Sequence, residues 1–283
     1  MGKKVLLLGA TGKMGAALSR HCPQGWVLTG LSSRDFDAAQ PDAATRLFEQ
    51  YAPDVVINTV GFLGIDPCEQ QPDLAFRVNA LFPYALAQAA AKSGALLVHF
   101  STDAVFNGDE DKSGYAESDA PGPVNVYGMT KLAGDYLVQN SACAFYLIRI
   151  SVLFGLSDKN NQFVEKMLDK IRAGAKTLRI ADDIWCSPCY SDDVAHGVYG
   201  LIGAAAPHGL YHMANAGSTS LYGLMSEIAG LVAPDVAVLP GSHLDFPFVG
   251  RKNLRTPLVS ERLAPLPDWR DAVRRYVRSL GDV

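Results

Sequence analysis

The sequence of 283 residues lacks the features of several large protein classes. It has 25 Lys and Arg against 29 Asp and Glu, a net charge of −4, so no surplus of positive charge indicates binding to nucleic acid or a membrane surface. Its first apolar run, Val5–Leu8, is shorter than the roughly seven to fifteen residues of a secretory signal. The longest stretch without Asp, Glu, Lys or Arg, 194–226, is interrupted by His, Pro, Asn and Gly, which argues against a membrane span. We therefore expect a cytoplasmic protein that binds neither nucleic acids nor membranes.

Cysteine is also scarce. The five cysteines are odd in number and have no extracellular context, which indicates reduced thiols. The segment Trp185-Cys186-Ser187-Pro188-Cys189 imitates a thioredoxin-type redox motif, but it lies far from the first strand, where that motif belongs. No second Cys or His pair stands at ligand spacing, so we expect no metal site. Thiol–disulfide exchange is kept as the least favoured function.

What the sequence does contain is an alternation of short β-rich apolar runs with longer segments of helical period. This pattern predicts an α/β fold with a parallel sheet that is buried on both faces. After about residue 155 the alternation loosens, and 240–267 holds five prolines and is predicted to be irregular. The predicted strands are 5–8, 27–31, 54–58, 95–101 and 145–150, and the predicted helices between them are 13–21, 42–51, 73–92 and 126–140, the third with a kink at Pro83.

A glycine-rich loop follows the first predicted strand and opens the first predicted helix. It reads Gly9-Ala10-Thr11-Gly12-Lys13-Met14-Gly15, a GxxGxxG spacing. Backbone N–H groups and the helix dipole hold a pyrophosphate at such a place, so the loop predicts a dinucleotide site. The tip of the second strand, Leu31-Ser32-Ser33-Arg34, lacks the acid that holds the ribose of NAD. We therefore favour NADP(H), with NAD(H) as the alternative, and Asp37 stands where it would reach the adenine amine.

A tyrosine and a lysine, Tyr127 and Lys131, lie four residues apart on one face of the helix predicted over 126–140. A nearby ammonium favours the tyrosinate and so lowers the pKa of the phenol, which suits a general acid toward a ketone oxygen. The fourth strand ends at Thr102, at the edge where ligands bind in a parallel sheet. The loop, the strand-end hydroxyl and the Tyr-Lys pair together predict a hydride-transfer site.

Three long motifs narrow this prediction: Val98–Gly108, Tyr115-Ala-Glu117 and Asn125–Gly134. With the glycine loop, they resemble the dTDP-4-dehydrorhamnose reductase family of extended short-chain dehydrogenases/reductases, densely over residues 95–135 and thinly after 215. The resemblance implies a Rossmann-type doubly wound sheet in residues 1–155 and a smaller C-terminal, mainly substrate-binding domain in 156–283, with some segments returning to the sheet. It also implies NAD(P)H-dependent reduction of the 4-keto group of a nucleotide-linked deoxysugar.

The resemblance assigns site residues as well. It implies Thr102, Tyr127 and Lys131 as catalytic residues, with Lys131 also holding the cofactor ribose. The implied cofactor contacts are Gly9, Thr11, Gly12, Lys13, Met14, Arg34, Asp37, Val60, Gly61, Tyr127, Lys131, Ile150 and Ser151. The implied substrate contacts are Thr102, Asp103, Ala104, Phe106, Val152 and Gln162.

Three substrate positions depart from the family pattern. Val152 replaces the tryptophan that packs on the sugar, Ala104 replaces a tyrosine, and Gln162 replaces an asparagine. The chemistry is retained in this reading, but the sugar is left open. A second hypothesis is a dinucleotide-binding regulatory subunit without turnover, because the methionine adenosyltransferase β-subunit resembles the same family and lacks the same tryptophan. A homodimer is considered as the assembly, and His212 as an additional substrate contact.

Overall fold

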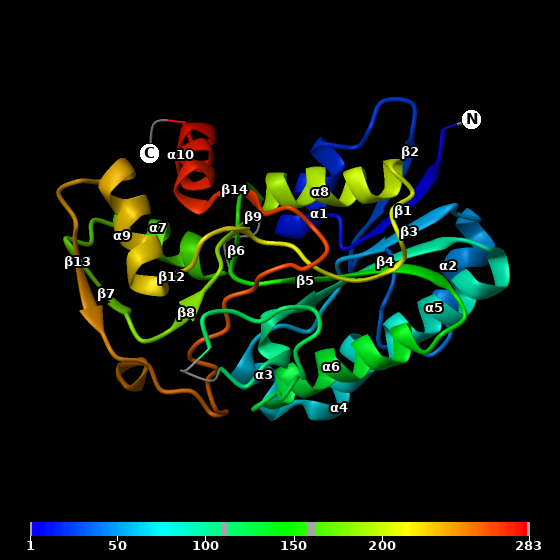
Figure 1. Ribbon diagram of the computed structural model, residues 1–283, viewed down its shortest axis with the longest axis horizontal. Helices are drawn as coiled ribbons and strands as arrows, with labels where there is room; N and C mark the ends of the chain where they lie inside the picture. Colours follow the sequence, from blue (N-terminus) through cyan, green and yellow to red (C-terminus); the bar gives the residue numbers. More distant parts are fainter. Residues whose placement is uncertain (1, 109–111, 158–161, 282–283) are drawn as a thin grey trace.

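The computed structural model describes residues 2–108, 112–157 and 162–281 (Figure 1). Its centre is a six-stranded sheet in the order β10-β5-β4-β3-β1-β2, with every neighbouring pair parallel. The strands are β1 (Lys4–Leu8), β2 (Val27–Leu31), β3 (Val55–Asn58), β4 (Leu96–Thr102), β5 (Ala144–Ile150) and β10 (Gly209–His212). The predicted α/β class with a parallel, doubly wound sheet is confirmed.

Helices cover both faces of this sheet (Figure 1). The side chains of a strand alternate between its two faces, so Val5 and Leu7 of β1 pack against one helical layer, and Leu6 and Leu8 against the other. The first layer holds α1 (Lys13–Arg20) and α8 (Ser191–Gly203). The second holds α2 (Ala43–Tyr51), α5 (Phe82–Ser93) and α6 (Val126–Gln139).

The helix predicted over 73–92 is broken in the structure. A short helix α3 (Ile65–Gln70) and α4 (Pro72–Phe76) precede a π-helical segment, η1 (Arg77–Leu81), and α5 begins only at Phe82. Pro83 has no N–H for the carbonyl of Asn79, and its ring crowds that carbonyl, so the regular hydrogen-bond ladder cannot continue there. The predicted kink is therefore a π-helical turn just before the proline. Gly134 of α6 packs on this turn, since a Cβ on it would lie 2.2 Å from the Asn79 oxygen.

The chain after residue 155 builds a second core and also returns to the sheet. Phe154, Leu178, Leu224 and Trp269 belong to this core, which is separate from the two sheet layers. Its elements are α7 (Phe163–Arg172), β7 (Thr177–Ala181), α9 (Leu221–Val232), β13 (Ala237–Gly241) and α10 (Trp269–Ser279). Two elements of this part of the chain return to the sheet: β10 pairs with β5 as an edge strand, and α8 packs on one face. The division of the chain at residue 155 into two domains stays a prediction.

Short pieces connect the two cores. They are η2 (Asp103–Val105), β6 (Leu153–Phe154), β8 (Trp185–Cys186), β9 (Cys189–Tyr190), β11 (Asn215–Ala216), β12 (Thr219–Ser220), η3 (His243–Asp245) and β14 (Leu266–Asp268). Most of 242–265 is irregular, as its prolines predict. Within the described ranges, no helix has both the length and the apolar character to cross a membrane.

Candidate active site

The glycine loop closes tightly between β1 and α1. Gly9 has φ of +85°, a conformation that side chains disfavour. A Cβ on Gly15 would lie 2.2 Å from the Gly9 oxygen and 2.7 Å from the Ala10 Cα, so only glycine lets the helix approach the loop this closely. Gly12 is the N-cap of α1 and has no side chain to cap it. The first N–H groups of the helix therefore face the space in front of the loop.

That space is a cavity of about 500 Å³ at the carboxyl ends of β1, β2 and β3. Seven predicted cofactor residues line it: Gly9, Thr11, Gly12, Lys13, Asp37, Val60 and Gly61. Ser33, Phe36, Ala38, Thr59, Phe62, Leu63 and Val78 line it too, although the site prediction did not include them. Gln162 also reaches this cavity, whereas the resemblance implied a substrate contact for it. Backbone positions after successive strands thus meet at one edge of the sheet, which is the place for a dinucleotide.

Two predicted cofactor residues, Met14 and Arg34, do not line this cavity, and the ammonium of Lys13, which does line it, is engaged by another residue. The side chain of Met14 is buried in the sheet core, and Arg34 is exposed and is not among the lining residues. The ammonium of Lys13 is turned away from the loop and forms a buried ion pair of 2.5 Å with Glu165 of α7. Burial lowers the pKa of Lys13, and the Glu165 carboxylate opposes this. Lys13 therefore ties the glycine loop to the C-terminal core.

Thr102 and Asp103 stand at the end of β4, and Asp103 is the centre of a hydroxyl cluster. Its carboxylate accepts from Thr102 Oγ1 at 3.1 Å, Ser151 Oγ at 2.6 Å and Thr256 Oγ1 at 2.7 Å. Burial raises the pKa of Asp103, and these three donors oppose the rise. Ser151, predicted to border the cofactor, is thus directed at Asp103. Ile150, the residue before it, packs against the sheet core.

Tyr127 lies in the first turn of α6, where its phenol meets the hydroxyl of Thr102. Burial raises the pKa of the phenol above its ordinary value, and the hydrogen bond with Thr102 opposes this rise. The Tyr-Lys spacing predicted a lowered pKa for this phenol, and that net direction is wrong, because desolvation outweighs any lowering effect of the neighbouring charge. At neutral pH the phenol is protonated.

Lys131 is buried one turn further along α6, and its amine is directed at the strand beside it. Nζ donates to the Phe100 carbonyl at 2.7 Å and lies 3.5 Å from His99 Nε2. His99 Nδ1 in turn lies 3.1 Å from the amide nitrogen of Asn58. Burial lowers the pKa of Lys131 to about 8, and Asp135 opposes the shift. Burial and Lys131 hold the pKa of His99 well below its ordinary value, so the imidazole is neutral.

Of the remaining predicted substrate residues, Ala104 lies beside Thr102, whereas Phe106 and Val152 pack in cores. Ala104 follows Asp103 in η2, and its N–H donates to Thr102 Oγ1 at 3.2 Å. Phe106 is fully buried and stacks on Tyr115 with ring centroids 4.2 Å apart, so it is a core residue. Val152 packs at the border of the C-terminal core. Thr256, which contacts Asp103 from a segment of irregular structure, was missed as a site residue because its sequence offered no signal beyond the family motif.

The cysteine pair has no redox character in the structure. Cys186 and Cys189 are both buried, and their thiols lie near backbone carbonyls, including that of Thr219. Burial raises the pKa of Cys186 well above its ordinary value and that of Cys189 to about 12. A redox thiol needs a lowered pKa, so nothing here supports thiol–disulfide exchange. In the described part of the chain, no three His, Cys, Asp or Glu residues gather as metal ligands.

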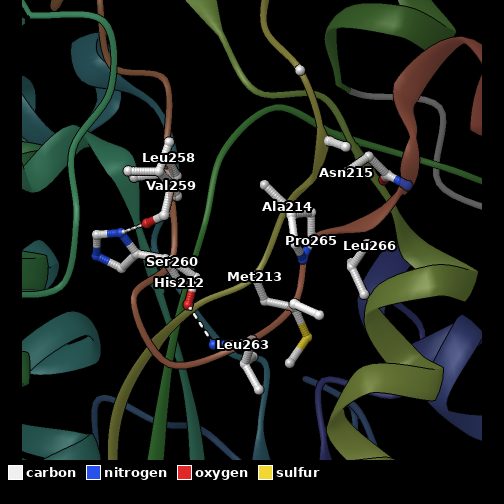
Figure 2. A pocket seen from close by; sticks show the side chains of 13 residues that line it. His212, Met213, Ala214, Asn215, Leu258, Val259, Ser260, Leu263, Pro265 and Leu266 are labelled. Atoms are coloured by element: carbon white, nitrogen blue, oxygen red, sulfur yellow. Dashed lines mark hydrogen bonds between the residues drawn. The ribbon is translucent and has the colours of Figure 1, made fainter.

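His212, considered as a substrate contact, is held by backbone groups. Nδ1 lies 2.9 Å from the Tyr115 carbonyl and 3.0 Å from that of Val259, and Figure 2 shows the ring directed at Val259. The pocket beside it, between 212–217 and 258–266, has a volume of only about 170 Å³. The ring is 2% exposed and packs edge-on against Phe106. This environment is that of a structural histidine.

The comparisons with known proteins agree with this geometry. The family described as RmlD substrate binding domain matches residues 3–281. The chain belongs to this family. The family member dTDP-4-dehydrorhamnose reductase of Salmonella typhimurium is 33% identical over 98% of this chain and 97% of its own. The spore coat polysaccharide biosynthesis protein SpsK of Bacillus subtilis is 31% identical over 97% of both chains.

A solved structure of this RmlD type is also similar. It is the dTDP-4-dehydrorhamnose reductase of Bacillus anthracis in complex with NADP, which is 26% identical, covers 99% of this chain and 100% of its own, and superposes with a TM-score of 0.92. The resemblance inferred from the motifs is thereby confirmed as family membership, and the similarity in fold covers nearly the whole chain.

Proposed function

We propose that this protein is an NADP(H)-dependent reductase of a nucleotide-linked 4-keto deoxysugar. The observation that carries the proposal is the meeting of Thr102 and Tyr127 at the sheet edge that also bears the glycine-loop cavity. The relatives named above, which are dTDP-4-dehydrorhamnose reductases or act in polysaccharide biosynthesis by name, support the same reaction. A dTDP-linked sugar is accordingly the first substrate to test.

The residues of the cavity fit a dinucleotide. Gly9 and Gly15 allow the loop to turn tightly against α1 and leave the N-terminus of this helix accessible, as the binding of a pyrophosphate requires. Ser33 lines the cavity just after β2 and offers a hydroxyl to a 2′-phosphate, and the Asp35 carboxylate is engaged by the backbone N–H and the hydroxyl of Ser32. These features favour NADP(H), which the Bacillus anthracis relative binds, over NAD(H). When bound, the reduced nicotinamide supplies the hydride.

The protein's own groups handle the oxygen of the substrate. Tyr127, protonated at neutral pH because burial raises its pKa, holds the proton that the carbonyl oxygen takes as its carbon is reduced. The Thr102 hydroxyl donates to Asp103 at 3.1 Å, and it orients the same oxygen by turning this single proton toward the substrate when the substrate is bound. Lys131, one turn further along α6 and held by the Phe100 carbonyl at 2.7 Å, supplies a positive charge that favours the tyrosinate which proton donation leaves behind.

The test is turnover by the purified protein. We expect oxidation of NADPH only when a 4-keto nucleotide deoxysugar is present, followed as the loss of absorbance of the reduced cofactor, with the alcohol identified by mass. The regulatory-subunit hypothesis expects NADPH binding with no turnover of any substrate in a panel that varies base and sugar. That result would exclude the reductase.

We infer a homodimer as the assembly of this protein. The helices α4, α5 and α6 lie together, and several large apolar side chains on these helices and on η1 are exposed: Phe76, Leu81, Tyr84, Met129 and Tyr136. Such a group of side chains is typical of a protein interface. Light scattering should give twice the mass of the chain, and Leu81→Lys with Met129→Lys should give the monomer. A monomeric wild type excludes this assembly.

A further inference from the structure

Asp135 is a fully buried carboxylate of α6 that lies one turn beyond Lys131. Tyr127, Lys131 and Asp135 follow one another at intervals of four residues, so their side chains lie on one side of the helix. The helix packs on β4 and β5, and Lys131 and Asp135 are both buried in the layer between them. Asp135 is thus next to Lys131 on the side away from Tyr127.

The hydrogen-bond partner of Asp135 is Arg149 of β5. Arg149 Nε donates to Asp135 Oδ2 at 3.0 Å, and neither side chain is more than 3% exposed. Burial raises the pKa of Asp135, and the charges of Arg149 and Lys131 oppose this rise. A guanidinium does not lose its proton in a protein, so a neutral Asp135 would leave Arg149 buried without a counter-ion. Asp135 is therefore ionised.

A single hydrogen bond joins this ion pair. Asp135 Oδ1 and Arg149 Nη1 are both buried, and neither has a hydrogen-bond partner among the described residues. A bidentate pair would engage both of these atoms. One oxygen of the carboxylate is thus not committed to Arg149, and Lys131 is the second cation whose charge acts on Asp135.

Asp135 is the anion that two buried cations share. Without it, Lys131 and Arg149 would lie in one layer with no negative charge among their described neighbours, which is unfavourable. Only Lys131 can relieve this, because a buried ammonium loses its proton readily and a guanidinium does not. The charge of Asp135 therefore acts on the protonation of Lys131.

The neutral groups around Lys131 supply no second anion. His99 of β4 lies 3.5 Å from Lys131 Nζ, and burial together with the charge of Lys131 holds its pKa well below the ordinary value. Burial raises the pKa of Tyr127, which keeps its proton. Cys68 of α3, whose charge would act on Tyr127, is a thiol at neutral pH because burial raises its pKa to about 11.

The other carboxylate at this site does not replace Asp135. Asp103, at the end of β4, acts on Tyr127 and is not among the charges that act on Lys131. In the described part of the chain, Asp135 is the only charged group that raises the pKa of Lys131, which burial lowers to about 8. Asp135 also raises the pKa of Tyr127, so the titration of Lys131 has to be measured by itself.

We propose that Asp135 is a positioning residue for the reduction, whose negative charge keeps Lys131 an ammonium at neutral pH and balances Arg149 beside it. The inference deepens the proposed function and rests on it. Asp135 is fully buried and does not line the glycine-loop cavity, so it acts through Lys131. The charge of Lys131 in turn favours the tyrosinate that Tyr127 becomes when it gives up its proton.

The first test follows the titration of Lys131 by NMR without any substrate. In protein with isotope-labelled lysine, the signal that is missing in Lys131→Arg belongs to Lys131, and in the wild type it should titrate with a midpoint of about pH 8. We expect Asp135→Asn to lower this midpoint by roughly one to two pH units, because the opposite charge is lost. Asp135→Glu keeps the charge and should stay within about half a unit of wild type.

The second readout is the pH profile of kcat/KM with a 4-keto nucleotide deoxysugar. With the midpoint lowered in this way, kcat/KM of Asp135→Asn should be roughly 5- to 50-fold below wild type at pH 8 and within about twofold of it at pH 6. A role that is only structural would lower kcat/KM by the same factor at every pH. Glu49→Gln, which removes an exposed carboxylate from α2, is the matched control and should leave the midpoint and the profile unchanged.

A double variant keeps the test decisive where the single variant does not fold. Asp135→Asn leaves the Arg149 guanidinium buried without a counter-ion, which is destabilising. Asp135→Asn with Arg149→Gln leaves no unpaired guanidinium and should be the more stable of the two in urea. Its Lys131 midpoint should lie between those of Asp135→Asn and the wild type, because an anion and a cation are both gone.

The outcomes separate this inference from the proposed function. A Lys131 midpoint equal to that of the wild type in Asp135→Asn overturns the role of Asp135, even if the wild type reduces a 4-keto nucleotide sugar. Where the single variant does not fold, the same result in the double variant overturns it. A lowered midpoint supports the role of Asp135 even if the wild type shows no reduction, since the titration needs no substrate.

Discussion

The two halves of the site are built in different ways. The half that we propose for the cofactor consists of backbone positions that directly follow β1, β2 and β3, and its glycines matter because they are small, as at Gly9 and Gly15. The half that we propose for the substrate joins Asp103 to Ser151 and to Thr256, which lie 48 and 153 residues further along the chain. Loops that directly follow predicted strands can be recognised from the sequence. A site assembled from distant segments can be recognised only when the packing of the second core against the sheet is known.

The largest effect is expected at the catalytic helix, which belongs to neither half. Tyr127→Phe removes the proton donor and should lower kcat by roughly 10²- to 10⁴-fold. NADPH should bind nearly as to wild type, because Tyr127 does not line the glycine-loop cavity. Steady-state kinetics and titration measure the two quantities. Full turnover by this variant would remove Tyr127 from the mechanism.

The buried ion pair that ties the halves together gives the next effect. Glu165→Leu leaves the ammonium of Lys13 buried without its partner and should lower the free energy of unfolding by about 3–5 kcal/mol. Urea denaturation measures this. The double variant Lys13→Met, Glu165→Leu should recover most of the loss, because no unpaired charge remains. Equal instability of the single and double variants would argue against the ion pair as the cause.

A change in the glycine loop should weaken the binding of NADPH and also lower the stability of the protein. Gly15→Ala places a Cβ against the Gly9 oxygen and should lower the free energy of unfolding by about 1–3 kcal/mol, with weaker NADPH binding. Gly200→Ala in α8 is the matched control, since a Cβ there meets nothing within 4 Å. It should leave NADPH binding unchanged and should not destabilise the helix. Equal effects of the two changes would show that the loop tolerates a side chain.

The pH dependence reports on Lys131. Its pKa of about 8 lies below the ordinary value, so the ammonium is present below pH 8 and is lost as the pH rises above it. We expect kcat/KM to fall above about pH 8, toward tenfold lower for each further unit. Lys131→Arg stays charged and should move this fall to higher pH in whatever activity it keeps. A wild-type profile that is flat to pH 10 contradicts the role of the charge.

The smallest effect is expected in the substrate half. Thr256→Val removes one of the three hydroxyl donors to Asp103, a loss of about 1 kcal/mol. The KM for the sugar nucleotide should rise several-fold while the dissociation constant of NADPH stays constant. Thr256→Ser keeps the hydroxyl and should behave as wild type. A change in NADPH binding instead would show that the two halves are not independent.

The sequence predicted the local features well and the long-range ones poorly. The strands β1 to β5 were found to within a residue or so, because buried parallel strands are continuous apolar runs. The strand β10 was missed, since Gly209–His212 is four residues long and has no alternation. The π-helical turn before Pro83 was expected only as a kink. The pKa of Tyr127 was predicted in the wrong direction, because spacing on a helix reveals a neighbouring charge but not the desolvation around it.

By itself, the sequence determined the parallel sheet, the glycine loop and the Thr, Tyr and Lys set, because each of these depends on residues close together in the chain. Only the tertiary structure decided that Lys13 pairs with Glu165, that Thr256 donates to Asp103, and that Asn125, at the start of the helix of Tyr127, bonds to the Arg251 carbonyl. Such contacts arise when two separately packed cores meet, and the energy of burying or pairing a charge depends on that meeting. The periodic pattern of one segment does not show which residues of another segment will contact it.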